Sequence, residues 1–312
     1  KKQIIDLKNV IIKGNLFVNI HLGHIDLNNV KAKDVIILSA GSNSVSFKDN
    51  SSVNTITVLN KTPVRITSEP SVTIKNINLS PSGDSLSKNR VILDGTFFTT
   101  NISIQSSLIL EGGPNLQIFN PIYIKNSNLN DQINFKGNFQ QVKNVIIENP
   151  ITILGDFQKP PKNINIEIAT NTFNNPVFLK GNLSSSTILI STNSSIICDG
   201  NFNTINIIGP KEVLLQLDTG TTINDFNCYT IVRVNGTEDA INNLLANSHV
   251  YDKGQIIIDV MFKTIHLTDG HGIINTTIST PGKFDIILKV KENNDILTLS
   301  KKINVTIHPN KF

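Results

Sequence analysis

The amino-acid sequence predicts an all-β protein. We expect a right-handed parallel β-helix of about ten rungs over residues 1–208, followed over residues 209–312 by a small, mostly antiparallel β domain with one short helix. Two observations carry this prediction. One short motif recurs at a nearly constant interval, and the chain is rich in Ile and Asn but poor in Ala, which favours strands and turns over helices.

The recurring motif is apolar–x–apolar–x–Gly, followed by Asn, Thr or Asp and then by Phe or Leu. Six copies fit this template well, and four weaker copies extend the series. The turn positions lie on average about 21 residues apart, at Gly14, Asn29, Asp49, Asn76, Gly95, Gly112, Gly137, Gly155, Gly181 and Gly200.

This interval is typical of one turn of a parallel solenoid. Alternation places both apolar residues of the motif on the inner face of a short strand, and Gly, Asn or Asp tolerates the left-handed backbone that turns the chain. Parallel crossovers are right-handed, which predicts a right-handed coil. Most rungs carry a second expected strand, at residues 54–58, 101–104, 144–147, 163–168, 187–190 and 203–208.

The template also predicts which side chains stack inside the coil. Because they share one place in the motif, six residues are expected to form a single interior column: Ile12, Leu93, Phe135, Ile153, Leu179 and Cys198. An antiparallel sandwich is the competing fold, but it does not require the same corner motif at a near-constant period.

The motif stops after Gly209-Pro210. A helix is expected over about residues 237–246, with Thr237 as N-cap and two acidic residues in its first turn. Because a solenoid end needs covering, residues 209–312 are expected to form a C-terminal β cap or an immunoglobulin-like domain. The strands expected there are 213–215, 230–234, 255–262, 272–279, 283–290 and 296–307, the last two forming a hairpin.

The cysteine usage is compatible with an extracellular protein, whereas the number of sequons hardly distinguishes secreted from cytosolic proteins. Cys198 and Cys228 are compatible with one disulfide or with two buried thiols, and we expect the disulfide. Such a chain, rich in Asn, Ser and Thr, also produces many Asn-x-Ser/Thr sequons by chance. The predicted glycosylation sites are Asn50, Asn60, Asn78, Asn101, Asn182, Asn193, Asn235, Asn275 and Asn304.

No apolar stretch reaches the length of a membrane span. We therefore expect a cell-surface or secreted protein whose membrane anchor, if it has one, lies outside this chain. The net charge is +4, but the lysines are scattered along the sequence without a basic block, so no nucleic-acid partner is expected. His21 and His24 point to opposite faces of a strand, and no metal or other cofactor is expected.

One short motif is similar to part of a known catalytic motif. Asp269-Gly270-His271-Gly272 resembles the Gly-His-Gly motif of the polygalacturonase family. That family also has Asn-Thr-Asp, Asp-Asp and Arg-Ile-Lys motifs, which are absent here. A carboxylate pair at a set separation, as glycoside hydrolysis requires, is not indicated by the sequence. No catalytic residues are therefore assigned, and the chain is not expected to be an enzyme.

The rungs over roughly residues 1–208 resemble those of the pectin-lyase-like parallel β-helix superfamily, which implies fold more than function. Residues 144–153 and 283–290 also resemble, in style, the ectodomains of social-amoeba cell-surface adhesion and recognition proteins, which carry immunoglobulin-like TIG/E-set modules. The function expected from these resemblances is recognition or adhesion. The partner would be another cell-surface protein or a second copy, bound through a solenoid face.

Two other functions remain open at this point. One is a secreted carbohydrate-active enzyme or carbohydrate-binding β-helix, and the other is a structural coat or matrix component. An exposed groove with converging carboxylates would favour the enzyme, whereas a flat apolar patch would favour the adhesion module.

Overall fold

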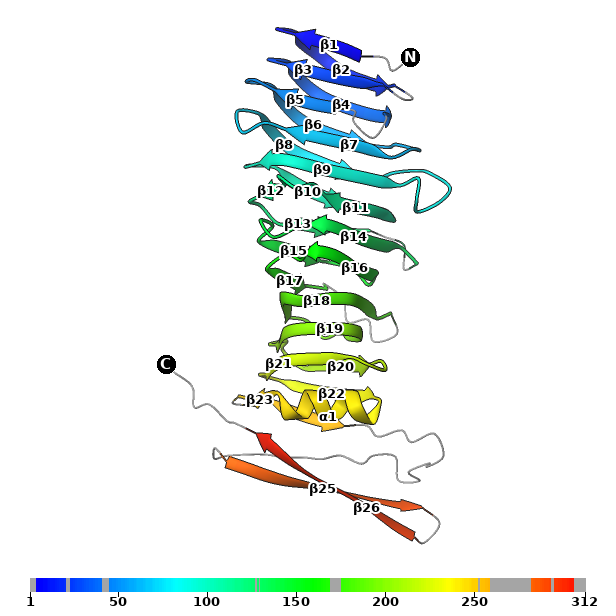
Figure 1. Ribbon diagram of the computed structural model, residues 1–312, viewed down its shortest axis with the longest axis vertical. Coiled ribbons are helices and arrows are strands. Elements are labelled where there is room, and N and C mark those ends of the chain that lie inside the picture. Colours follow the sequence, from blue (N-terminus) through cyan, green and yellow to red (C-terminus); the bar gives the residue numbers. More distant parts are fainter. Residues whose placement is uncertain are drawn as a thin grey trace. The chain divides into compact units, whose positions relative to one another are not determined.

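A computed structural model describes residues 4–20, 23–40, 45–126, 128, 130–168, 175–251, 253–258, 282–292 and 295–305. They form an all-β structure, a parallel β-solenoid of about 11 turns with one short helix (Figure 1). The fold class predicted from the sequence is thereby confirmed. The chain divides into two units, Lys1–Ile164 and Asn165–Phe312, and each is described by itself.

In the first unit, each rung contributes strands to two parallel ladders. The first ladder runs in the order β1 (Ile4–Lys8), β3 (His24–Asn28), β5 (Val45–Lys48), β7 (Val64–Ser68), β9 (Arg90–Phe97), β11 (Leu108–Gly112), β14 (Gln132–Asn138) and β16 (Thr152–Lys159). The second ladder runs in the order β2 (Ile11–Asn19), β4 (Lys31–Ser39), β6 (Ser52–Val58), β8 (Thr73–Leu79), β10 (Asn101–Ile104), β13 (Ile122–Ile124) and β15 (Asn144–Ile147). The short β12 (Gln117–Ile118) pairs with the end of β9, and β17 (Asn163–Ile166) lies at the unit boundary.

The core lies between the ladders because apolar residues alternate along each strand. In the first ladder, Ile25, Val45, Ile66 and Leu93 are successive register partners, and none is more than 4% exposed. Burying such side chains contributes roughly 1.5–3 kcal/mol each. A single rung has no neighbour to cover its apolar side chains, so the rungs bury them, and are stable, only when they stack on one another.

Left-handed residues turn the chain at many of the expected corners. Asn29, Asp49, Gly95, Gly137, Gly181 and Gly200 all have positive φ. In the first rung the left-handed residue is Asn9, with φ 54°, rather than Gly14. Gly14 instead lies within β2, beside an irregularity in the pairing with β4. Asn76, Gly112 and Gly155, also expected to be left-handed, do not have positive φ.

The predicted single interior column is wrong in its register. Leu93, Phe135, Ile153, Leu179 and Cys198 are all buried, but Ile12 is half-buried and belongs to the second ladder. Phe135 is opposite Gly155, whereas Ile153 is opposite Ile133. The register between two rungs depends on the length of the corner between them, and the motif does not encode that length.

In the second unit, parallel pairing continues beyond residue 208. The strands are β18 (Val177–Ile190), β19 (Ser195–Ile207), β20 (Glu212–Leu217), β21 (Thr222–Cys228), β22 (Ile231–Gly236), β23 (Ser248–Val250) and β24 (Gln255–Ile258). β20 and β22 carry alternating apolar residues without the glycine motif, so the end of the motif does not coincide with the end of the parallel ladder. Division into domains at residue 208 stays a prediction.

The predicted helix is confirmed as α1 (Glu238–Ala246), with Ile241, Leu244 and Leu245 buried. Its N-cap is Thr237, as expected, although the Thr237 hydroxyl makes no capping hydrogen bond. The C-terminal hairpin is also confirmed: β25 (Gly282–Glu292) pairs antiparallel with β26 (Asp295–Val305). Most residues of the strands expected at 255–262 and 272–279 lie outside the described part, except for β24.

The expected disulfide is not present in the structure, because Cys198 and Cys228 are both free, buried thiols. Cys198 is opposite Leu217 in β20, whereas Cys228 is opposite Ile207 in β19, so the cysteines belong to different columns. Burial raises the pKa of the Cys228 thiol to about 12 and that of Cys198 further. At neutral pH neither thiol therefore supplies the reactive thiolate.

We expect iodoacetamide at pH 8 to label neither cysteine in the folded protein and to label both after unfolding without reductant. The folded protein resists because its thiols are inaccessible and protonated. Mass spectrometry of the intact chain measures the number of adducts. An unfolded, unreduced chain with no adduct would show instead that the disulfide forms.

Candidate functional site

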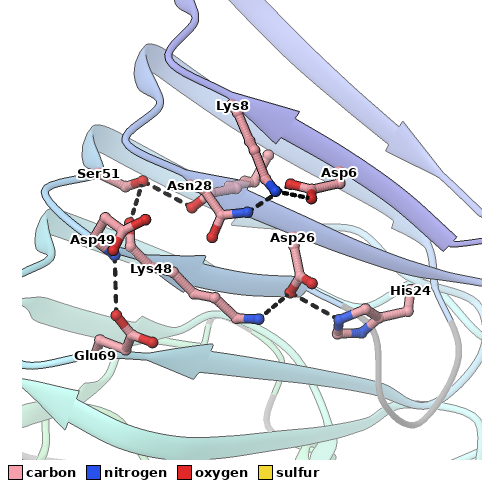
Figure 2. A network of polar contacts seen from close by, with 10 residues as sticks. Asp6, Lys8, His24, Asp26, Asn28, Lys48, Asp49, Ser51 and Glu69 are labelled. Atoms are coloured by element: carbon pink, nitrogen blue, oxygen red, sulfur yellow. Dashed lines mark hydrogen bonds and ion pairs between the residues drawn. The ribbon is translucent and has the colours of Figure 1, made fainter.

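A polar hollow in the described part of the first unit lies where β1, β3 and β5 end. It has a volume of about 510 Å³ and is lined by Asp6, Lys8, Asn9, Asp26, Asn28, Lys48 and Asp49. Strand alternation explains the set: the inner positions hold apolar residues such as Leu27 and Phe47, which leaves the outward positions to charged and amide side chains. Figure 2 shows Asp6, Lys8 and Asn28 gathered together on neighbouring strands, and Lys48 reaching toward Asp26.

Two ion pairs, one within a rung and one between rungs, involve four of the five charged residues that line this hollow. Lys8 Nζ lies 2.8 Å from Asp6 Oδ2, and Asn28 Nδ2 donates to Asp6 Oδ1 at 2.6 Å. Lys48 Nζ lies 2.8 Å from Asp26 Oδ1, which His24 Nε2 also contacts at 2.9 Å. The hydrogen bond from Lys8 lowers the pKa of Asp6, and the same contact raises the pKa of Lys8.

Asp6 and Asp26 are register partners, so this hollow holds two aspartates on neighbouring strands. Burial alone would raise the pKa of Asp26, but hydrogen bonds from Lys48 and His24 outweigh it, and the pKa falls. A catalytic general acid needs the opposite shift, because it must hold a proton near neutral pH. Neither aspartate is therefore tuned as a general acid.

The turn beside the hollow is also held by hydrogen bonds between rungs. Asn29 Nδ2 donates to Asn9 Oδ1 at 2.8 Å, and the Asp49 amide donates to Glu69 Oε2 at 3.0 Å. Ser51, buried at the same corner, donates its hydroxyl hydrogen toward Leu27 O and Lys48 O (Figure 2). These contacts give the left-handed residues a structural role, which is to fix the corner.

A second candidate site is a pair of exposed phenylalanines. Phe98 and Phe119 are 46% and 43% exposed, and their ring centroids lie 4.8 Å apart. β12 brings them together, because Ile118 is the register partner of Phe97 and the next residue of each strand projects outward. Sequence analysis did not identify this pair, because neither Phe98 nor Phe119 occupies a position of the recurring motif.

The second unit carries an aromatic pair of its own. Tyr229 and Tyr251 stack with centroids 4.4 Å apart and planes 7° from parallel. Tyr251 Oη donates to Asn227 Oδ1 at 3.2 Å, and Tyr229 is 41% exposed. Burial, reinforced by Tyr229 and Asp225, raises the pKa of Tyr251, so its hydroxyl keeps its proton at neutral pH.

The predicted glycosylation sites differ widely in accessibility. Asn50, Asn101 and Asn182 are exposed, and Asn78, Asn193 and Asn235 are half-buried. Asn60 is 0% exposed, and its amide nitrogen donates to Thr62 O at 2.5 Å, so this side chain leaves no room for a glycan in the folded chain. Asn275 lies outside the described residues, and only the backbone of Asn304 is described.

The remaining candidate residues, Asp269, His271 and His21, lie outside the described residues. Within the described ranges, no group of three or more His, Cys, Asp or Glu side chains is arranged to hold a metal ion. No helix in that same part of the chain is long and apolar enough to cross a membrane.

Comparison of the chain with protein-family models, curated proteins and solved structures finds no match. The parallel solenoid is the part of the predicted resemblance that the structure shows. Membership of the pectin-lyase-like superfamily stays a prediction.

Proposed function

We propose that this chain is an extracellular recognition module, at a cell surface or in secreted form, that binds a protein partner through the outside of its solenoid. The observation that carries the proposal is the Phe98–Phe119 pair, two nearly half-exposed rings in contact with each other on the outside of the first unit. Aromatic side chains are enriched at protein interfaces, where they supply large contact area at low entropic cost. The resemblance to adhesion ectodomains points in the same direction.

The solenoid supports this function in two further ways. Parallel register places outward side chains in straight rows, which gives a broad and rigid contact surface. In the polar hollow near β1, β3 and β5, four of the five charged side chains pair with one another, which suits a solvated surface more than a reaction centre.

We expect the double substitution Phe98→Ser and Phe119→Ser to weaken binding to a protein partner by at least about tenfold, because both anchors lose their apolar contact area. The measurement is capture of purified cell-surface ectodomains by beads carrying the chain. Phe17→Ser is the matched control, since Phe17 is 61% exposed but stands apart from the pair, in β2.

Equal binding by all three proteins would remove the phenylalanine pair from the interface. If no ectodomain is captured while a glycan array gives a hit, the proposal should be replaced by the carbohydrate-binding alternative.

A further inference from the structure

Six lysines that are dispersed in the sequence lie along one edge of the first unit. We call them the lysine strip: Lys13, Lys31, Lys33, Lys75, Lys143 and Lys162, all exposed. They lie at the corner where each rung enters the second ladder. The outward positions at this corner therefore concentrate positive charge that the sequence spreads over 150 residues.

The register of β2, β4, β6 and β8 places the first four of these lysines. Lys31 is the partner of Ile11. Lys13 and Lys33 both lie between the pairs Ile12↔Ala32 and Asn15↔Asp34. Lys75 occupies the same place two rungs further on, because Ala32 aligns with Val53 and Ile74 while Asp34 aligns with Thr55 and Asn76.

The phenylalanine pair continues the strip. Ile118 bridges to Val142, so the following residues, Phe119 and Lys143, occupy neighbouring positions. The Lys162 amide donates to Val142 O at 3.3 Å, and the Asn163 amide donates to Lys143 O at 3.2 Å, which brings Lys162 beside Lys143. On one side of the aromatic pair, the stack continues with Lys143 and then Lys162. On the other side, Asn101, three residues after Phe98, pairs with Asn76, which follows Lys75.

The lysines of the strip differ from those of the first ladder. In the first ladder Lys8, Lys48 and Lys136 each pair with an aspartate. No ion pair involves any of the six strip lysines within the described residues. At the next outward positions along β2, β4, β6 and β8, Asp34 is the one carboxylate, beside Asn15, Thr55 and Asn76.

Resting on the proposed function, we propose that the lysine strip and the Phe98–Phe119 pair form one interface for an acidic protein surface with a central apolar contact. Unpaired ammonium groups attract carboxylates over a distance comparable to the Debye length, and the phenylalanines supply the desolvated centre. Lysine binds carboxylates as a point charge without the fixed fork geometry of arginine, which suits a broad electrostatic contact.

The dimensions and charges of the strip identify the kind of partner. Lys13 and Lys162 are seven rungs apart, which is about 34 Å at about 4.8 Å per rung. An interface that buries about 800 Å² per partner is roughly 30 Å across, so a row of this length can span it. A second copy would need a complementary acidic row, and the described acids of the first ladder are instead paired with lysine, arginine or histidine.

The test uses an array of purified cell-surface ectodomains, grouped by net charge, and measures binding kinetics of the whole chain at 50 and 300 mM NaCl. The strip variant is Lys75→Glu/Lys143→Glu/Lys162→Glu. The control variant, Lys61→Glu/Lys211→Glu/Lys253→Glu, makes the same change in net charge at exposed lysines off the strip. Phosphatidylserine vesicles and dextran sulfate are tested in parallel, and circular dichroism verifies that both variants are folded.

We expect the binders to be acidic ectodomains whose association rate falls roughly tenfold between the two salt concentrations. The strip variant should lose at least about tenfold in affinity, and the control variant should lose little. Binders that are insensitive to salt and to the strip variant would overturn this inference and leave the proposed function standing. Equal losses in both variants would overturn the assignment to this edge. Binding of vesicles or dextran sulfate without any ectodomain would contradict both proposals.

Discussion

Replacing Gly137 by alanine is expected to destabilise the first unit by roughly 2–4 kcal/mol. Gly137 has φ of 81°, and a Cβ atom there would lie 2.3 Å from the carbonyl oxygen of Gly112 in the adjacent rung. The substitution therefore combines an unfavourable left-handed backbone with a clash against backbone that cannot move without breaking the ladder.

Gly14→Ala is the matched control for this measurement. Gly14 belongs to the same sequence motif, but its φ is not positive and a Cβ would meet nothing within 4 Å. We expect it to leave the free energy of unfolding unchanged or slightly increased, because alanine restricts the unfolded chain. Urea unfolding followed by circular dichroism measures both. Equal effects of the two substitutions would contradict the corner geometry.

Phe135→Ala is expected to cost about 3–5 kcal/mol of stability. Phe135 is 1% exposed, and its ring centroid lies 5.3 Å from that of Phe139 and 5.4 Å from that of Phe157. Removing the ring loses its burial and leaves a cavity bounded by two other rings from successive corners, which cannot collapse without moving two rungs.

The control for this substitution is Phe17→Ala, a change of the same chemistry at a side chain that is 61% exposed. It should alter the free energy of unfolding by no more than about 0.5 kcal/mol. A similar loss in both variants, again from urea unfolding, would show that Phe135 does not lie in the packed interior.

The rungs were predictable because the residues of the strands and the residues of the corners both favour the same fold. Alternating apolar residues give the strands, and left-handed residues such as Asn29, Gly95 and Gly200 give the corners. The register was less predictable. The motif aligns Gly137 with Gly155, but the structure pairs Gly137 with Phe157, because the corner preceding each strand sets the alignment. β20 and β22 were not recognised as solenoid strands, because they carry the alternation without the motif.

The candidate surfaces were less predictable than the fold. Phe98 and Phe119 are separated by 20 residues, and nothing local marks them as neighbours. The lysines gave no basic block in the sequence, because a parallel solenoid gathers residues spaced by one rung rather than adjacent residues. A search for unpaired charges at the interval of the repeat would find the strip once the register is known.

The most direct test of parallel stacking measures a distance between two rungs of the first unit. Spin labels on cysteines replacing Lys33 and Lys143, both exposed and five rungs apart, report it by pulsed electron spin resonance, since the native thiols are buried. Parallel stacking predicts one narrow distribution centred at about 24 Å, which is five steps of about 4.8 Å each. A broad distribution, or one centred beyond about 40 Å, would contradict the parallel stack and with it the lysine strip.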